Sequence, residues 1–341
     1  MNKEIIYLDL FSGTGGFAKG FLSAGFIFKQ HYFSEINPYA SANYQNNFKY
    51  ATPLGNIKNI KSSKIEKPNL ITFGSPCQDI SIAGKRKGLN GARSGLFFEA
   101  VRIIRECQPD TFVFENVKGL FSSNKGRDFE IVLKAFADIG LYDIEWQLLN
   151  TRWFLPQNRE RIYIVGHLRK TSAQQVFPIG KIDKGNDSII QESSSHKIIP
   201  TITTKISDGC YRSPHVFQAN TNDQIILKNK QDRKYKHLVF SRHSYKHFNL
   251  SKIRAGMLRR LTPIECERLQ GFPDNWTEFG LVDNELKAIS NSQRYAMLGN
   301  AVSVVVVKEI AKRLLNNHSI HNSLDGFDTN LLSENHSLGM V

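Results

Sequence analysis

The first 170 residues alternate strand-like runs with helix-like runs, and this rhythm constrains the fold more than any other feature of the chain. β-Branched and aromatic residues predict strands over 5–11, 28–35, 69–74, 111–117, 143–150 and 161–167. Apolar residues at helical spacing predict helices in the intervening stretches "GGFAKGFLSAG", "YASANYQNNF", "LFFEAVRIIREC" and "DFEIVLKAFADIG". This is the pattern of βαβ units, so we expect an α/β fold with a doubly wound mixed sheet and helices on both faces.

The alternation of strand-like and helix-like runs stops near residue 170, and this change predicts a second domain. Residues 171–258 are dominated by turn-forming stretches such as "DKGND" and "SDGCYRSPH". Helical patterns return in "TPIECERLQGF" and in "VSVVVVKEIAKRLLNN", which is apolar enough to pack back on the sheet. We expect a first domain over 1–170 completed by a segment over 290–317, a smaller irregular β-rich domain over 171–289, and a flexible tail over 318–341.

Charge and cysteine content narrow the class of protein. The formal net charge of +14 indicates a polyanionic partner, most often nucleic acid. The four cysteines form no CxxC pair and have no histidine at zinc-ligand spacing, so we expect neither disulfides nor a bound metal. The N-terminus lacks the apolar core of a signal peptide, and the strongest apolar run, "AVSVVVV", is too short to cross a bilayer. We therefore expect a cytoplasmic protein with no membrane contact.

A glycine-rich turn in "DLFSGTGGFA", residues 9–18, predicts a cofactor site. Gly13, Gly15 and Ala18 fit the G-x-G-x-x-G/A pattern, in which missing side chains let a nucleotide approach the backbone and a helix N-terminus. Glu35, at the end of the next predicted strand, is the acid expected to bind ribose hydroxyls. The pattern does not decide between NAD and S-adenosylmethionine as the cofactor. A glycine turn that only packs a helix on the sheet, without binding a cofactor, is the alternative.

Two candidate catalytic residues follow neighbouring strands. Cys77 comes after "NLITFGSP" and Glu115 after "TFVF", and ligands of an open α/β sheet bind at that carboxyl edge. A cysteine nucleophile acts as its thiolate, which needs partial exposure and nearby positive charge. Charge of that sign is available from Lys85, Arg86, Lys87, Arg159 and Arg161. The alternative is a small buried cysteine and an exposed glutamate without a chemical role.

Six stretches together resemble the signature blocks of the DNA cytosine-5 methyltransferases, in the order that family keeps. They are "DLFSGTGGF", "GSPCQDIS", "ENV", "QNRERIYIVG", "RRLTPIECERLQGFPDNW" and "YAMLGNAVSVV", and the resemblance as a whole spans residues 5 to about 315. The resemblance implies a Rossmann-like fold that uses S-adenosylmethionine and releases S-adenosylhomocysteine. It also implies that the β-rich region is a target-recognition domain that binds double-stranded DNA.

The resemblance implies a role for each candidate catalytic residue. Cys77 would attack carbon 6 of cytosine, which makes carbon 5 able to accept a methyl group. Glu115 would hold ring nitrogen 3 and the exocyclic amine. We expect one of Arg159 and Arg161 to contact the oxygen of the base and the other to lie on the opposite face of the strand. Which of the two contacts the base is left open. The alternative role for this pair is a salt bridge with Glu160 or a phosphate contact. The base would have to be flipped out of the duplex to be reached.

Cofactor contacts are implied in the same way. Phe11 would lie against the adenine, Glu35 would bind the ribose, Pro76 would lie beside the methyl donor and Asn300 near the methionine end. The full expected set is Phe11, Gly13, Thr14, Gly16, Glu35, Ile36, Asn56, Ile57, Pro76, Asn300 and Val302. Asn56 stands where the family commonly has aspartate, so its contact with the adenine amine loses a charge and we expect somewhat weaker cofactor binding.

Basic stretches predict the DNA-binding residues. The glycine-rich loop 78–95 directly follows the candidate nucleophile and suits a segment that closes on DNA. The stretch 228–260 interleaves basic and aromatic residues. The expected contacts are Gln78, which would fill the gap left by the flipped base, and Ser81, Lys85, Arg86, Lys87, Arg93, Arg233, Lys236, Arg242 and Lys246.

We expect a monomer that protects host DNA from a partner restriction endonuclease, without binding that enzyme. Three other functions stay open: an RNA methyltransferase of the same fold, a DNA-binding relative without catalysis, and a dinucleotide oxidoreductase in which Cys77 and Glu115 would be idle.

Overall fold

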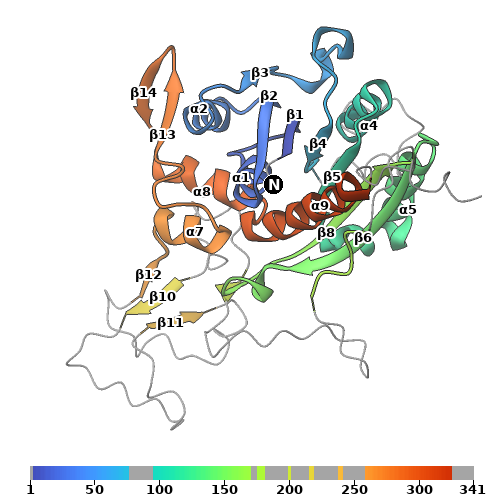
Figure 1. Cartoon of the computed structure of the whole chain (residues 1–341). Coiled ribbons are helices and arrows are strands. Elements are labelled where there is room, and N and C mark those ends of the chain that lie inside the picture. Colours follow the sequence, from blue (N-terminus) through green and yellow to red (C-terminus); the bar gives the residue numbers. More distant parts are fainter. Residues whose placement is uncertain are drawn as a thin grey trace, which may run out of the picture.

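A seven-stranded sheet forms the centre of the computed structural model, which describes residues 3–76, 95–169, 175–180, 199–200, 215–218, 237–240 and 258–324. Its strand order is β3-β2-β1-β4-β5-β8-β6 (Figure 1). The strands are β1 (Lys3–Leu10), β2 (Phe26–Ser34), β3 (Thr52–Pro53), β4 (Leu70–Phe73), β5 (Thr111–Val117), β6 (Tyr142–Asn150) and β8 (Glu160–Leu168). The first five strands pair in parallel, and β8 lies antiparallel between β5 and β6. The predicted doubly wound mixed sheet is confirmed.

Helices cover both faces of this sheet. The α-helices in the described residues are α1 (Gly16–Ala24), α2 (Pro38–Asn47), α4 (Gly95–Cys107), α5 (Arg127–Ala137), α7 (Pro263–Gln270), α8 (Asn291–Asn300) and α9 (Val304–Leu324). Because successive strand residues point to opposite faces, Tyr7 joins the core under α1 and α9, whereas Leu8 joins the core under α4 and α5. Helices α1 and α9 run side by side (Figure 1). Gly20 permits this contact, since a Cβ there would lie 2.5 Å from Val307.

The strand order places a ligand crevice between β1 and β4. From β1 the chain moves outward to β2 and β3, and then returns to the other side of β1 to form β4 and β5. In the β1–β4 register Leu10 lies beside Phe73, so the segments that follow these two residues leave the sheet next to each other. The carboxyl ends of strands at such a reversal are where open α/β sheets bind ligands.

Residues 171–258 contribute short strands at 199–200, 215–218, 237–240 and 258, whereas the described residues 175–180 form neither a strand nor a helix. Strands β10 (His215–Gln218), β11 (His237–Phe240) and β12 (Leu258–Arg260) form a three-stranded antiparallel sheet (Figure 1). Strand β9 (Ile199–Pro200) pairs with β7 (Gln157–Asn158).

Residues 261–289 were predicted as part of the second domain, yet they pack closely against the first. Cys266 of α7 shares a buried cluster with Leu298 of α8 and Val304 of α9. The hairpin of β13 (Phe279–Val282) and β14 (Glu285–Ala288) lies against α2, where a Cβ on Gly280 would be 2.9 Å from Ala42 Cβ. The boundary at residue 289 stays a prediction.

The last helix is longer than the sequence pattern predicts. Helix α9 continues to Leu324, whereas the pattern places the end of its segment at residue 317. Buried Val307, Ile310 and Leu314 anchor its first turns on the sheet. Once a helix is nucleated, each added residue gains one backbone hydrogen bond, so a polar continuation can remain helical.

Candidate active site

A cavity of about 760 Å³ opens where β1 and β4 end, at the reversal of strand order. This volume lies within the range of pockets that enclose small-molecule ligands, roughly 300 to 1,000 Å³. Eleven of the residues selected from the sequence line it: Phe11, Gly13, Glu35, Ile36, Asn56, Ile57, Pro76, Glu115, Arg159, Arg161 and Asn300. They come from segments far apart in the chain, so the fold brings most of the predicted cofactor and catalytic residues together.

The glycine turn after β1 presents bare backbone to this cavity. Gly13 has φ +55°, a conformation that favours glycine, and a Cβ there would meet no atom within 4 Å. Its N–H donates to Glu35 Oε2 at 2.9 Å, and the N–H groups of Ile36 and Asn37 each donate to Glu35 Oε1 at 2.8 Å. The Glu35 carboxylate therefore joins the end of β2 to the turn. A nucleotide-like ligand would meet an open backbone beside a fixed carboxylate.

Three predicted cofactor residues do not line the cavity. The Thr14 side chain is buried and donates a hydrogen bond to Asn43 Oδ1 of α2. Gly16 and Val302 lie where α1 contacts the residues before α9. A Cβ at Gly16 would be 2.7 Å from Val302 Cγ2. Sequence spacing cannot distinguish these positions from Gly13, because the direction of each residue depends on the backbone path of the turn.

The Gly-Ser-Pro turn after β4 lies directly beside Glu115 of β5. Glu115 is buried, and a Cβ at Gly74 would be 3.2 Å from its Oε2, so glycine leaves space for the carboxylate. Asn116 Nδ2 donates to the Ser75 carbonyl at 3.3 Å and holds the turn against β5. Pro76 lines the cavity. Cys77 follows it in the chain and lies outside the described residues, so its role stays a prediction.

Two arginines, Arg159 just before β8 and Arg161 within it, complete the polar part of the cavity. Arg161 Nε lies 3.1 Å from Glu115 Oε1. Arg159 is more deeply buried, and its guanidinium donates to the Ala301 carbonyl at 2.7 Å, just past the end of α8. The interpretation that these side chains lie on opposite faces is wrong, because residues two apart along a strand share a face and both line the same cavity.

Burial and charge set the protonation of this cluster. Burial raises the pKa of Glu115, although the nearby guanidinium groups of Arg161 and Arg159 lower it. Burial also lowers the pKa of Arg159 to about 9, helped by the like charge of Arg161, so Arg159 stays charged at neutral pH. A buried carboxyl with a raised pKa beside a fixed cation can hold or donate a proton to a bound ring.

A second buried carboxyl, Asp9, belongs to β1 and stabilises the elements around the site. It accepts hydrogen bonds from Thr72 Oγ1 at 3.0 Å and from the Tyr44 hydroxyl at 3.0 Å, so it joins β1, β4 and α2. Burial raises its pKa to about 8 from an ordinary value of 3.8, although the hydroxyl donors oppose the shift. Asp9 does not line the cavity but lies two residues before Phe11, which does.

We expect Asp9 to make stability depend on pH. The folded chain keeps a proton on Asp9 that the unfolded chain loses above about pH 4, so its contribution to stability falls as the pH rises from about 4 to about 8. A shift of this size corresponds to at most about 6 kcal/mol. Asp9→Asn should flatten the pH dependence of the free energy of unfolding, measured by urea denaturation at pH 5 and pH 8.5. Asp138→Asn, in an exposed pair with Lys134, is the control; equal slopes in both variants would contradict the expectation.

Sequence reasoning missed part of the lining. Ala296, Met297 and Gly299 of α8 and Lys58 after β3 also face the cavity. The stretch "YAMLGNAV" was a visible signal for α8, but only the packing of that helix shows which of its faces is turned inward. The predicted DNA contacts Gln78, Ser81, Lys85, Arg86, Lys87, Arg93, Arg233, Lys236, Arg242 and Lys246 lie outside the described residues and stay predictions.

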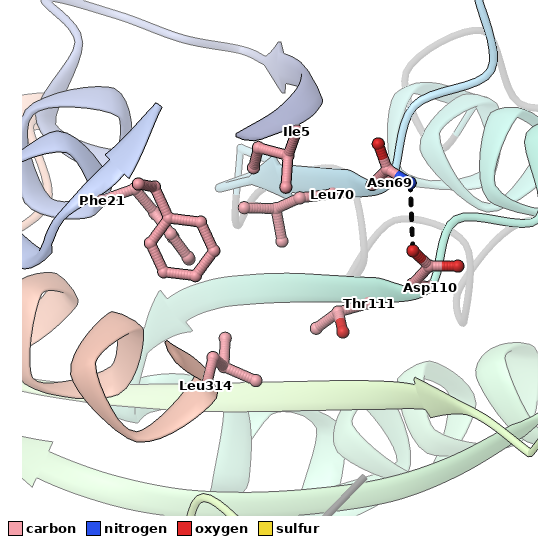
Figure 2. A pocket seen from close by; sticks show the side chains of 8 residues that line it. Ile5, Phe21, Asn69, Leu70, Asp110, Thr111 and Leu314 are labelled. Carbon is pink, nitrogen blue, oxygen red and sulfur yellow. Dashed lines mark hydrogen bonds between the residues drawn. The ribbon is translucent and has the colours of Figure 1, made fainter. Parts of the chain in front are cut away.

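A far smaller cavity lies at the amino-terminal end of β4 and β5 (Figure 2). Its volume is about 20 Å³, and it is lined largely by apolar side chains such as Phe21 and Leu314. Asn69 Nδ2 donates to Asp110 Oδ2 at 3.1 Å on its rim. This space suits about one water molecule and no cofactor, so the large cavity is the candidate active site. Among the described residues, no cluster of potential metal ligands is found.

The fold and site define a class of enzyme, an α/β protein in which a glycine turn, a buried carboxyl and two arginines line one cavity at the carboxyl edge of the sheet. Residues 5–316 match the family model of the C-5 cytosine-specific DNA methylases, so the chain belongs to that family and is a DNA (cytosine-5-)-methyltransferase. The family and fold imply S-adenosylmethionine as the cofactor.

Similar proteins of known name agree with this assignment. The chain is 34% identical over 319 residues to the Type II methyltransferase M1.ScrFI of Lactococcus lactis subsp. cremoris, covering 90% of this chain and 77% of that one. It is 32% identical over 326 residues to M.HaeII of Haemophilus aegyptius, covering 92% and 94% of the two chains.

Solved structures share the fold. The S. pombe Dnmt2 methyltransferase has a TM-score of 0.63 at 18% identity, covering 92% of this chain and 99% of that one. The Entamoeba histolytica methyltransferase EhMeth has a TM-score of 0.61 at 20% identity, covering 93% and 99%. In the part of the chain that the structure describes, no helix is long and apolar enough to span a membrane.

Proposed function

We propose that this enzyme methylates carbon 5 of a cytosine that is flipped out of a specific short sequence in double-stranded DNA, through a covalent adduct with Cys77. The observation that carries the proposal is the position of Glu115, buried in the cavity, 3.1 Å from Arg161 and next to the turn that leads into Cys77. A nucleophile and an acid at one cavity are what addition to a pyrimidine ring requires.

The lining of the large cavity fits S-adenosylmethionine. Phe11, Ile36 and Ile57 offer one aromatic and two aliphatic surfaces for an adenine, and Glu35 offers a carboxylate for ribose hydroxyls beside the bare Gly13 backbone. Asn56 Oδ1 accepts from the Lys58 N–H at 3.0 Å, so part of its acceptor capacity is already used. The bound cofactor supplies an electrophilic methyl group on its sulfonium sulfur.

Each residue then performs a separate task on the cytosine. The Cys77 thiolate adds to carbon 6 and pushes electrons onto carbon 5, while Glu115 shares a proton with ring nitrogen 3 and accepts a hydrogen bond from the exocyclic amine. Carbon 5 takes the methyl group and then loses its own proton, and departure of the thiolate from carbon 6 restores the aromatic ring. The products are 5-methylcytosine and S-adenosylhomocysteine.

The contacts of the two arginines favour different roles for them. Arg159 is occupied by the Ala301 carbonyl and holds the end of α8 against β8. Arg161 lies beside Glu115 with its side chain partly exposed, so it is the better candidate for the oxygen of the base. It would also keep Glu115 oriented while the ring changes charge.

The remaining expectations concern partners. The basic loop after Cys77 and the β-rich region would bind the duplex, which agrees with the net charge of +14. Relatives named Type II methyltransferases support a role in protecting DNA from a restriction endonuclease. We propose a monomer in the cytoplasm, with the division 1–170 plus 290–317 for catalysis and 171–289 for DNA recognition.

Base-resolution mapping of transferred label tests this function. The purified protein is incubated with methyl-labelled S-adenosylmethionine and mixed-sequence duplex DNA, and we expect label on cytosine carbon 5 within one short motif. The same incubation with tRNA should give no label. Label on RNA alone, or binding of DNA without any transfer, would overturn the proposal.

A further inference from the structure

The segment that follows α7 is hydrogen-bonded to the back of the glycine turn. Trp276 Nε1–H donates to the Thr14 carbonyl at 2.8 Å. Thr14 lies next to Gly13, the residue whose backbone faces the cavity. Residues at 14 and 276 thus meet directly, although neither Thr14 nor Trp276 is among the residues that line the cavity.

Asn43 of α2 closes this contact into a ring. Its Nδ2 donates to the Trp276 carbonyl at 2.8 Å and to the Phe279 carbonyl at 2.7 Å, and its Oδ1 accepts from the Thr14 hydroxyl. Asn43 has no exposed surface, so its own amide groups would be left unpaired in the interior if their partners were removed. The three side chains connect the turn, α2 and the segment after α7 in one closed network.

Aromatic packing leaves the turn little room to move toward this network. The Trp276 ring lies 5.6 Å from the Phe48 ring, between centroids. A Cβ at Gly15 would be 2.4 Å from Phe48 Cε2, so the turn already contacts the aromatic layer closely. On its other side the turn is held by the Gly13 N–H bond to Glu35. Its position is therefore fixed from behind by aromatic rings and from the cavity side by a carboxylate.

We propose that Trp276, Asn43 and Thr14 are positioning residues, which hold the glycine turn in the conformation that binds the cofactor. The turn is thereby tied to residues 276–279, which run from α7 toward α8, whose own residues line the same cavity. This inference rests on the proposed binding of S-adenosylmethionine at the turn. It assigns to Trp276 a role in cofactor affinity and none in the chemical step.

Trp276→Phe tests the proposal because it removes the N–H donor and keeps an aromatic ring. We expect the Kd for S-adenosylhomocysteine, measured by isothermal titration calorimetry, and the KM for S-adenosylmethionine to rise about tenfold. We expect kcat at saturating cofactor to stay within about twofold. Tyr142→Phe is the matched control: it removes a buried aromatic hydroxyl that donates to the Pro109 carbonyl at 2.9 Å, at the start of β6 and outside the cavity lining.

Thr14→Val provides a second variant of nearly unchanged shape, which removes only the bond to Asn43. A raised Kd in Thr14→Val and Trp276→Phe, with Tyr142→Phe like the wild type, supports the proposal. Wild-type affinity in either folded variant overturns it, as does an equal loss of affinity in Tyr142→Phe. If the wild type itself binds no S-adenosylhomocysteine, the proposed function fails instead, so the two failures are distinguishable.

Discussion

Cys77→Ser is expected to lower methyl transfer by about 10⁴-fold or more while binding of S-adenosylhomocysteine and duplex DNA stays close to wild type. A serine hydroxyl keeps the size of the thiol but is almost wholly protonated at neutral pH, so it cannot add to carbon 6. Pro76, the residue before Cys77 in the chain, lines the cavity. Label transfer under single-turnover conditions measures the loss.

A duplex with 5-fluorocytosine at the target position tests the adduct itself. Once the methyl group has been added, the fluorine cannot leave carbon 5 as a proton does, so the bond between Cys77 and carbon 6 should persist. We expect a protein–DNA complex that survives denaturing electrophoresis in the wild type and is absent in Cys77→Ser. Cys107→Ala is the control, since burial raises the pKa of the Cys107 thiol to about 11 and keeps it inert. An active Cys77→Ser enzyme would refute covalent catalysis.

Glu115→Gln is expected to lower kcat by about 10²- to 10³-fold with little change in the KM for DNA. The amide can still form hydrogen bonds to the base, but it cannot share a proton with ring nitrogen 3 as the thiolate adds. Because burial raises the pKa of Glu115, the carboxyl keeps its proton further toward neutral pH than an exposed glutamate does. The wild-type kcat should therefore decline as the pH rises through that pKa, and the variant should lack this decline.

Glu160→Gln is the matched control for this experiment. Glu160 lies between the two arginines in sequence but forms a half-exposed pair with Lys118 at 2.9 Å, an interaction worth little in stability. We expect its kcat and pH profile to match the wild type. Equal losses in the two variants would show that removing charge near β8 matters and that the position of Glu115 does not.

Much of the fold follows from local sequence patterns. The predicted run 111–117 is strand β5 residue for residue, and the helix predicted in "DFEIVLKAFADIG" is α5. Such segments are predictable because side-chain periodicity reports which face is buried, and burial is the largest favourable contribution to folding. The hairpin of β13 and β14 was missed, since β14 is exposed along its whole length and has no buried face to mark it.

The candidate site, like the fold, has parts that the sequence predicts and parts that depend on tertiary contacts. The sequence by itself determined that Gly13 and Glu35 would follow strands, that Glu115 would lie near the carboxyl end of one, and that all three would meet at one edge of the sheet, because the carboxyl ends of parallel strands share that edge. Only the tertiary structure decided that Arg161 lies beside Glu115 while Arg159 holds the end of α8, and that Thr14 points to Asn43 instead of into the cavity. Those choices depend on contacts between residues far apart in the chain, such as Trp276 with Thr14, and no local pattern encodes them.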